Sequence, residues 1–428
     1  MESFARLRPS AKALLLLLAI VLPLLGIRHI AKSFSDPWIY KKDFLSGYLL
    51  AKALQTGIDP YLPIPELTQR WMPEHNVTGL RHPTPHTIAM GWLCYPFAWL
   101  PYEKAVWLWF GCELLFLALA MKLLFDGLGW TLAPRHWLLA CWLALGWMPI
   151  VEDLWYGQFS LFLLVLWLCT WRALRANRDA WGGVCLGAMM TLKLIGWPLV
   201  LWLAWQRRWR GVFAAALAAG SLHLAAIALH GWPMVRDYYF KYGPIVSAMY
   251  RVGDLNFSLM TFGRRLFSAF GVNYTITPLW ESPMLAQLAG AALPLLALVL
   301  AIYGAQRLRR FDAGFALLMS VSLILNPIAW THYLMGLCLA FALFAERMQR
   351  LDWPRARLWQ FVVCALPAFL PTSTWSGLVL ALTGNVYNSQ RPIVPFWAGL
   401  RQQEDEFIDE NLQLGMVGIP VLPGHDPV

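Results

Sequence analysis

Charged residues are scarce in this sequence. They make up 14% of its 428 residues, and hydrophobic residues make up 59%, whereas an average soluble domain has about 25% charged residues. This composition excludes most cytoplasmic enzymes and disordered regulators, because only a lipid bilayer accommodates so apolar a surface. We therefore expect an integral membrane protein.

The sequence also lacks the short motifs of several common enzyme sites. It contains no HExxH, Walker A or GxSxG motif, and no GxGxxG motif that follows a strand. Its seven cysteines lie in or beside apolar stretches, without CxxC or metal-type spacing. We interpret them as small buried apolar side chains, since free cysteines commonly take that place.

Positive charge exceeds negative charge, with 34 Lys and Arg against 24 Asp and Glu and a formal net charge of +10. In a soluble protein this excess would suggest a nucleic-acid partner. Here the basic residues form short runs between apolar spans, at 172–178, 207–210, 307–310 and 347–357. Such runs orient a membrane protein with its basic loops in the cytoplasm. We expect these runs to be cytoplasmic, and we expect no nucleic-acid partner.

The apolar spans predict an all-α polytopic bundle of about ten to twelve transmembrane helices. The first span, 14–27, follows basic residues and lacks a convincing cleavage site, so we expect an uncleaved helix with a cytoplasmic N-terminus. The later spans are 87–100, 105–125, 137–151, 159–171, 181–205, 211–230, 284–304, 313–327, 331–345 and 361–383. Several are shorter than the ~20 residues that cross a bilayer, and short spans usually line a cavity. Helix parity suggests that 87–100 or 137–151 is re-entrant.

The span 181–205 carries Lys193, Gly196 and Pro198 in its middle and basic runs at both ends. If both ends are cytoplasmic, the span must cross and return as two short helices. We expect Lys193 near the outer end of this broken segment.

A long polar loop, 33–85, follows the first span. Its residues 44–54 place apolar side chains at helical spacing, and Gly57 follows as a stop signal. This pattern predicts a short amphipathic helix lying on the membrane, with Asp59 and Pro60 in a turn. The domain boundary is expected at 384, where the transmembrane domain 1–384 gives way to an acidic extracytoplasmic tail, 385–428.

Polar residues next to apolar sequence fall on the predicted outer side of the membrane. They are Asp43, Glu152, Asp153, Gln158, Lys193, Asn256, Ser258, Arg264, Arg265, Asn326, Thr331 and His332. Ionisable residues at membrane depth are costly, and they mark functional sites by default. This one-sided distribution predicts a site in an outer cavity.

Most of these residues have a structural alternative. Asp43 is well placed to cap a helix at 44–55, and Glu152 and Asp153 suit a solvated loop. Lys193 can snorkel to an interface, and Arg264 and Arg265 can anchor a surface helix at the headgroups. His332 can be a packing residue. His75, His82 and His86 invite a metal interpretation, but their spacing does not favour it.

Six motifs occur in an order that resembles a known family. They are Asp43-Phe44 with Gly57-Ile58-Asp59-Pro60-Tyr61; His82-Pro83-Thr84-Pro85 with Pro96 and Leu100-Pro101; Gly157-Gln158; Leu186-Gly187 with Thr191-Leu192-Lys193 and Pro198; Asn256-Phe257-Ser258; and Asn326-Pro327-Ile328-Ala329-Trp330-Thr331-His332. Together they resemble the polyprenyl-phosphate-sugar-dependent glycosyltransferases of the GT-C fold, and more narrowly the glycosyltransferase 87 family. The sequence departs from the family pattern at Thr84, which splits a Pro pair, and at Ala329, which replaces a Ser.

The resemblance implies a multi-pass plasma (inner) membrane enzyme with an extracytoplasmic active site. It would transfer a sugar from a polyprenyl phosphate donor to a glycan or glycolipid acceptor. Mannose is our first expectation and arabinofuranose the second, because the family includes both kinds of enzyme. Asp43 matches the family's acidic residue in the first outer loop, so it is the expected general base.

The other roles follow from the same chemistry. The leaving phosphate needs positive charge and donors, for which Lys193, His332, Arg264 and Arg265 are candidates. We expect Gln158, Asn256 and Asp153 to bind substrate. Phosphate is a good leaving group, so we expect inversion by direct displacement, without a metal or cofactor. A second carboxylate near Asp43, from Glu152 or Asp153, would instead permit double displacement.

Two other functions compete with this interpretation. A secondary transporter or flippase would suit the broken helix at Lys193, although the halves of the chain show no inverted repeat. A polytopic assembly partner without chemistry would leave the one-sided polar residues unexplained.

Overall fold

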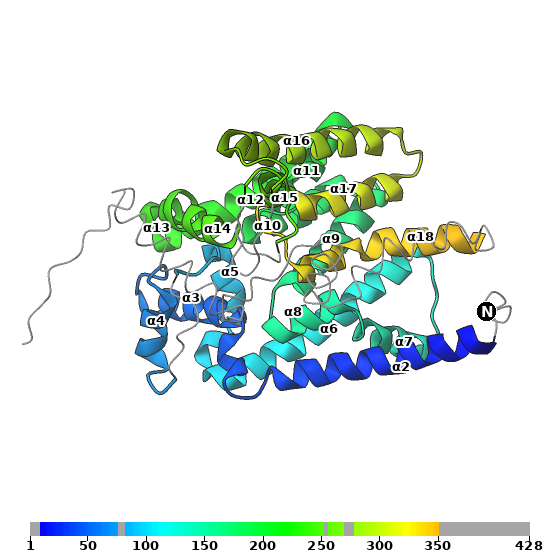
Figure 1. Cartoon of the computed structure of the whole chain (residues 1–428). Helices are drawn as coiled ribbons and strands as arrows, with labels where there is room; N and C mark the ends of the chain where they lie inside the picture. Colours follow the sequence, from blue (N-terminus) through cyan, green and yellow to red (C-terminus); the bar gives the residue numbers. More distant parts are fainter. Residues whose placement is uncertain (1–8, 76–81, 252–255, 269–277, 351–428) are drawn as a thin grey trace, which may run out of the picture.

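The computed structural model describes residues 9–75, 82–251, 256–268 and 278–350 (Figure 1). Within these ranges the ordered elements are helices and no strand occurs. The chain is thus an all-α polytopic membrane protein, as the composition predicts. The expected span 361–383, the boundary at 384 and the tail 385–428 lie outside the described residues.

Three helices in the described ranges are long and apolar enough to cross a bilayer. They are α6 (Tyr102–Leu128), α12 (Trp209–His230) and α16 (Pro283–Arg307). A fourth candidate is the pair α7 (Pro134–Ala144) and α8 (Met148–Tyr156), which is bent by 73° at its break. This bend fits a broken or re-entrant segment at 137–151. The total of ten to twelve crossings stays a prediction, because the described ranges provide three such helices, or four if the bent pair is one span.

The first expected span forms α2 (Pro9–Lys32), which packs against the bent pair. The indole Nε1 of Trp142 in α7 donates a hydrogen bond of 2.8 Å to the carbonyl of Ala19. Gly26 of α2 lies against the turn between α7 and α8, where a Cβ would overlap the Leu145 carbonyl oxygen. Close backbone contact of this kind is typical of helices that pack in membranes.

The first outer loop folds into short helices. These are η1 (Trp38–Lys41), α3 (Phe44–Thr56) and α4 (Ile64–Trp71), followed after the gap at 76–81 by α5 (Ile88–Cys94) and η2 (Phe97–Trp99). Figure 1 shows α3, α4 and α5 gathered at one end of the molecule. The expectation that α3 lies on the membrane surface is wrong, because ten of its 13 residues are buried. Its apolar face packs inside the protein, where the Phe44 ring stacks on Trp109 of α6 at 5.3 Å.

The span 181–205 is broken as predicted. It forms α10 (Asp179–Leu192) and α11 (Trp197–Trp205), with Lys193 directly after α10 and Gly196 at φ +92° before α11. Helix α10 packs closely on α12. A Cβ added at Gly183 would overlap the carbonyl oxygen of Gly211, and a Cβ added at Gly187 would overlap the carbonyl oxygen of Ala215. The small residues let the two backbones approach.

The remaining helices complete the wall around a central pair, α9 (Ser160–Arg175) and α17 (Phe311–Leu325), whose residues form much of the main core. They are α13 (Trp232–Asp237), η3 (Tyr238–Tyr242), α14 (Gly243–Arg251), α15 (Leu259–Arg265), η4 (Thr331–Leu337) and α18 (Cys338–Arg350).

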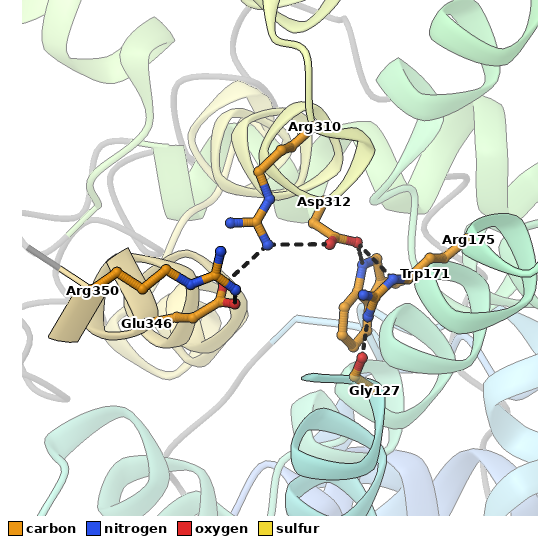
Figure 2. A network of polar contacts seen from close by, with 7 residues as sticks. All are labelled: Gly127, Trp171, Arg175, Arg310, Asp312, Glu346 and Arg350. Atoms are coloured by element: carbon orange, nitrogen blue, oxygen red, sulfur yellow. Dashed lines mark hydrogen bonds and ion pairs between the residues drawn. The ribbon is translucent and has the colours of Figure 1, made fainter. Parts of the chain in front are cut away.

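A polar network ties together the ends of α6, α9, α17 and α18 (Figure 2). Buried Asp312 accepts a hydrogen bond of 2.9 Å from the indole of Trp171 and lies 3.3 Å from the Arg175 guanidinium. Arg310 lies 3.9 Å from Asp312 and 3.0 Å from Glu346. Because α9 has 16 residues, it is about 24 Å long. The network therefore lies a full helix length from the N-terminus of α9.

Candidate active site

A cavity of about 680 Å³ forms where several helix ends meet. Its walls come from the start of α3, the end of α8, the break between α10 and α11, η3 with α14, and the segment between α17 and η4. Four of the predicted site residues line it together: Asp43, Gln158, Lys193 and His332. Residues separated by almost 290 positions in the sequence thus face one space.

Asp43 does not cap α3, although it occupies the N-cap position. The capping alternative is wrong for its side chain, which accepts a hydrogen bond from the side-chain amide of Gln158. The Ser46 hydroxyl donates to the Asp43 backbone carbonyl at 2.7 Å and so fixes the start of the helix. The carboxylate is therefore available to the cavity.

The neighbours of Asp43 have opposing effects on its acidity. Burial raises the pKa of Asp43 to about 6, while the Lys193 charge and the Gln158 hydrogen bond lower it. A base with a pKa near the working pH accepts a proton efficiently and still ionises. Asp43 thus has the electrostatic properties of a general base.

Lys193 follows α10 at the break and lines the cavity. Its Nζ lies 4.1 Å from the centre of the Tyr333 ring, a cation–π contact. No acidic side chain forms a salt bridge with it within the described ranges. This position, inside a cavity and beside an aromatic face, differs from that of a lysine that snorkels to an interface.

Two histidines share the cavity with Lys193. His332 is 3% exposed and His86 is 9% exposed, and the Nε2 atom of each has no hydrogen-bond partner among the described residues. Burial and the nearby Lys193 charge lower the pKa of His86 to about 3, so its ring is neutral. Buried polar atoms without partners are rare in folded proteins and usually mark a place for ligand or water.

The other predicted site residues lie outside the cavity lining. Asp153 is fully buried, and its Oδ2 accepts a hydrogen bond of 3.3 Å from the Leu161 backbone at the start of α9. Asn256 bonds to backbone on both sides: its Nδ2 donates to Pro327 at 2.9 Å, and its Oδ1 accepts from Ala329 at 3.0 Å. Both residues therefore hold loops that carry lining residues, instead of facing the cavity themselves.

Arg264 and Arg265 also lie outside the lining, in α15. Helix α15 packs on α16, and a Cβ at Gly290 of α16 would come within 2.8 Å of Arg264 Cγ. This helix contact directs Arg264 toward α16. The predicted phosphate-binding pair is thus not brought to the cavity.

The cavity contains a different arginine, which the sequence analysis missed. Arg251 ends α14 and lines the cavity, and its Nε has no hydrogen-bond partner among the described residues. The Arg251 carbonyl accepts a hydrogen bond of 3.0 Å from Thr261. The signal in the sequence is weak: Arg251 closes a tyrosine-rich stretch that also supplies the lining residues Tyr238, Tyr239 and Tyr250.

The histidines of the first loop have partners of other kinds. The His75 ring is 2.8 Å from the Tyr40 hydroxyl, and the His82 ring is 2.5 Å from that of Tyr250. In the described part of the chain, no group of three His, Cys, Asp or Glu side chains is arranged to hold a metal ion. His75 and His82 thus each contact a tyrosine hydroxyl.

The second carboxylate in the cavity is Glu152, the residue before Asp153 in α8. It lines the same space as Asp43, so it is not simply a solvated loop acid. The stereochemistry of any reaction here depends on which of the two carboxylates meets the sugar.

The model of glycosyltransferase family 87 matches residues 86–327. This segment is more than half of the chain and includes Gln158 and Lys193, whereas Asp43 and His332 lie outside it. No curated protein and no solved structure matches the sequence. The family match favours sugar transfer over transport of a lipid-linked substrate. The chain therefore belongs to glycosyltransferase family 87 and is a membrane glycosyltransferase.

Proposed function

We propose that the protein transfers a sugar from a polyprenyl phosphate donor to a glycan or glycolipid acceptor outside the cytoplasm. Mannose is the first candidate sugar and arabinofuranose the second. The reaction is a direct displacement with inversion, and Asp43 is its general base. The observation that carries this proposal is the shared cavity of the Asp43 carboxylate and the Lys193 ammonium, which forms no salt bridge among the described residues.

Asp43 suits the acceptor side of the reaction. The acceptor hydroxyl loses its proton as it attacks the anomeric carbon, and a carboxylate within hydrogen-bond reach can accept that proton. The Gln158 amide holds the Asp43 carboxylate from one side. With a pKa of about 6, Asp43 is ionised at neutral pH and more basic than an exposed aspartate.

Lys193 suits the donor side. When the bond to the sugar breaks, negative charge develops on the lipid phosphate, and fixed donors in a water-poor site stabilise that charge. His86, His332 and Arg251 line the same cavity, and the Nε2 atoms of the two histidines and the Nε atom of Arg251 have no hydrogen-bond partner among the described residues. We assign these four side chains to the phosphate, with Arg251 taking the place expected of Arg264 and Arg265.

The outer location of the site rests on charge. The basic runs at 172–178, 207–210 and 307–310 are expected in the cytoplasm. The cavity lies at the opposite ends of the helices that carry them, since α9 and α17 each join a cavity wall to the network of Figure 2. A flipped, lipid-linked sugar would reach the cavity from the outer side.

The test is sugar transfer in membranes from radiolabelled polyprenyl phosphate mannose or arabinofuranose. Asp43→Asn, which keeps the shape of the side chain, should lower the rate about 10³-fold, the usual contribution of a general base. The matched control is Asp59→Asn, because Asp59 only accepts a turn hydrogen bond of 2.9 Å from the Tyr61 backbone. It should retain full transfer.

Three outcomes would contradict parts of the proposal. Full activity of inserted Asp43→Asn would exclude Asp43 as the base. No transfer by the wild-type protein from either donor would exclude the donor class. A product that retains the anomeric configuration of the donor, measured by NMR, would indicate double displacement through Glu152 or Asp43.

A further inference from the structure

A buried lysine directly precedes the proposed base. Lys42 is only 2% exposed. Its Nζ donates hydrogen bonds of 2.7 Å to the Ser33 hydroxyl, 3.2 Å to the Leu154 carbonyl and 2.5 Å to the Trp155 carbonyl. Nζ also lies 4.4 Å from the centre of the Phe34 ring. All three donor positions of the ammonium are thus used by neutral acceptors.

Two of these acceptors belong to a helix end. Leu154 and Trp155 are in the last turn of α8, where carbonyl groups have no partner within the helix. The C-terminal end of a helix carries a partial negative charge, which a cation stabilises. The third acceptor, Ser33, follows α2 and donates its own hydroxyl to the Ile30 carbonyl at 2.7 Å. Lys42 therefore joins the ends of two helices to the segment that carries Asp43.

The end of α8 leads directly to the partner of Asp43. Gly157 follows α8 at φ +62°, and Gln158 comes next and donates to the Asp43 carboxylate. The contact is close: a Cβ at Gly157 would lie 3.0 Å from the Cβ of Phe44 and 3.7 Å from the Cδ of Lys42. Lys42 and Gln158 thus both join the start of α3 to the end of α8, through neighbouring hydrogen bonds.

A neutral side chain in the position of Lys42 would be buried at a lower cost in free energy. Burying an ammonium is expensive, even where hydrogen bonds satisfy it, and apolar replacements of buried charges are often neutral or stabilising. The acids that face Lys42 are Glu113 of α6 and Asp43 itself, and neither forms a salt bridge with it in the described residues. Stability alone therefore does not account for a lysine at this position.

We propose that Lys42 is a positioning residue for sugar transfer: it fixes the backbone of Asp43 against the end of α8, so that the carboxylate meets Gln158 and faces the cavity. This inference rests on the proposed function of Asp43. A displacement of about 1 Å in a reacting group can lower a rate 10²-fold.

The charge of Lys42 has a second effect that can be measured. Asp43 is faced by Lys193 from the break after α10, by Tyr102 of α6, by Tyr156 of α8 and by Tyr333 of η4. Lys193 lowers the pKa of Asp43 most, followed by the Gln158 hydrogen bond and then by Lys42. Without the Lys42 charge, the carboxylate holds its proton to a higher pH.

The experiment compares Lys42→Met, Lys42→Arg and Lys41→Met in the full-length protein in membranes. Lys42→Met should lower kcat about 10²-fold and leave the KM for the donor nearly unchanged, since the phosphate site is separate. The acid limb of its kcat/KM profile should move to higher pH. Lys42→Arg keeps the charge and donors, so it should recover most of kcat and the wild-type limb. Lys41→Met makes the same chemical change at the preceding residue, whose Nζ lies 4.9 Å from the centre of the Trp38 ring, and it should be neutral.

A double variant separates positioning from general stability. If Lys42 acts through Asp43, Lys42→Met should cause no further loss in an Asp43→Asn background. Wild-type kcat in Lys42→Met would overturn the inference. So would a loss that adds to that of Asp43→Asn and is not recovered by Lys42→Arg. If Lys42→Met does not insert, Lys42→Gln provides the same comparison. Each of these outcomes presupposes an active wild type, and they therefore differ from failure of the proposed function.

Discussion

Asp43 is a carboxylic acid whose neighbours act on its proton affinity in opposite directions. Burial favours the protonated form, whereas Lys193, Gln158 and Lys42 favour the ionised form, and the balance leaves a pKa of about 6. The neutral ring of His86, with its lowered pKa of about 3, does not titrate in the same range. We expect the acid limb of the pH dependence to report Asp43, because Asp43 is the group proposed to accept the acceptor proton.

We expect kcat/KM to fall about tenfold per pH unit as pH drops below about 6, because protonated Asp43 cannot accept the acceptor proton. Gln158→Leu removes a hydrogen bond that stabilises the ionised carboxylate, so it raises the pKa and moves the acid limb to higher pH. The measurement is transfer rate against pH for both proteins. An unchanged limb in Gln158→Leu would show that the limb belongs to another group.

We expect substitutions of Arg251 and Arg264 to have different effects on donor binding. Arg251→Met should raise the donor KM about 10- to 100-fold, since a charge-assisted hydrogen bond to phosphate contributes about 1.5–3 kcal/mol. Arg264→Met should leave donor KM unchanged, because its side chain packs toward Gly290 of α16. Steady-state kinetics with varied donor distinguishes the two. A larger effect of Arg264→Met on the donor KM would instead indicate that Arg264 binds the donor phosphate.

The sequence predicted part of this site for a physical reason. Asp43, Gln158, Lys193 and His332 stand out as polar residues in apolar surroundings, so composition alone draws attention to them. Arg251 does not stand out, because it lies in the long segment 231–256 between apolar spans, where a charged residue is unremarkable. Asn256 and Asp153 do stand out, yet the Asn256 amide and the Asp153 Oδ2 atom bond to backbone, and sequence cannot tell a bond to backbone from a bond to substrate.

Helix α3 shows the limit of periodicity for whole elements. Apolar residues at helical spacing require a partner surface, but the spacing is the same for a membrane surface and for a protein interior. The break in α10 and α11 was easier to predict, since Gly196 and Pro198 act on the backbone directly. The sequence therefore predicts where a helix breaks better than it predicts whether that helix faces lipid or protein.

The close contact of α10 and α12 can be tested with two glycines. Gly183→Ala places a Cβ onto the carbonyl oxygen of Gly211, so the helices must separate, at a cost of about 1–3 kcal/mol. Gly220→Ala in α12 adds the same atom where no heavy atom lies within 4 Å. Thermal unfolding in detergent should show a lower Tm for Gly183→Ala only. Equal values for the two variants would contradict the packing.

The molecule as a whole has two chemically different ends. Arg175, Arg310 and Arg350 belong to one polar network (Figure 2), and the opposite ends of α9 and α17 adjoin the cavity. Arginines of this kind favour the cytoplasmic side. We therefore predict that the network lies on the cytoplasmic side and the cavity on the outer side.

Cysteine labelling tests that orientation. In a protein whose seven native cysteines are replaced by serine, a membrane-impermeant maleimide should label Arg236→Cys in intact cells. It should label Arg309→Cys only after the membrane is opened, because Arg309 is exposed on the basic end. Arg236 is likewise exposed, in α13 beside the cavity. Reversed labelling would place the cavity in the cytoplasm.

The cavity walls are contributed in the order in which the chain is synthesised. Asp43 emerges first and His332 last, with Gln158 and Lys193 between them. During translation the base and its amide partner can meet early, but the side of the cavity formed by the segment between α17 and η4 is still missing. Sugar transfer should therefore begin only after the segment between α17 and η4 has been synthesised and has closed this side of the cavity.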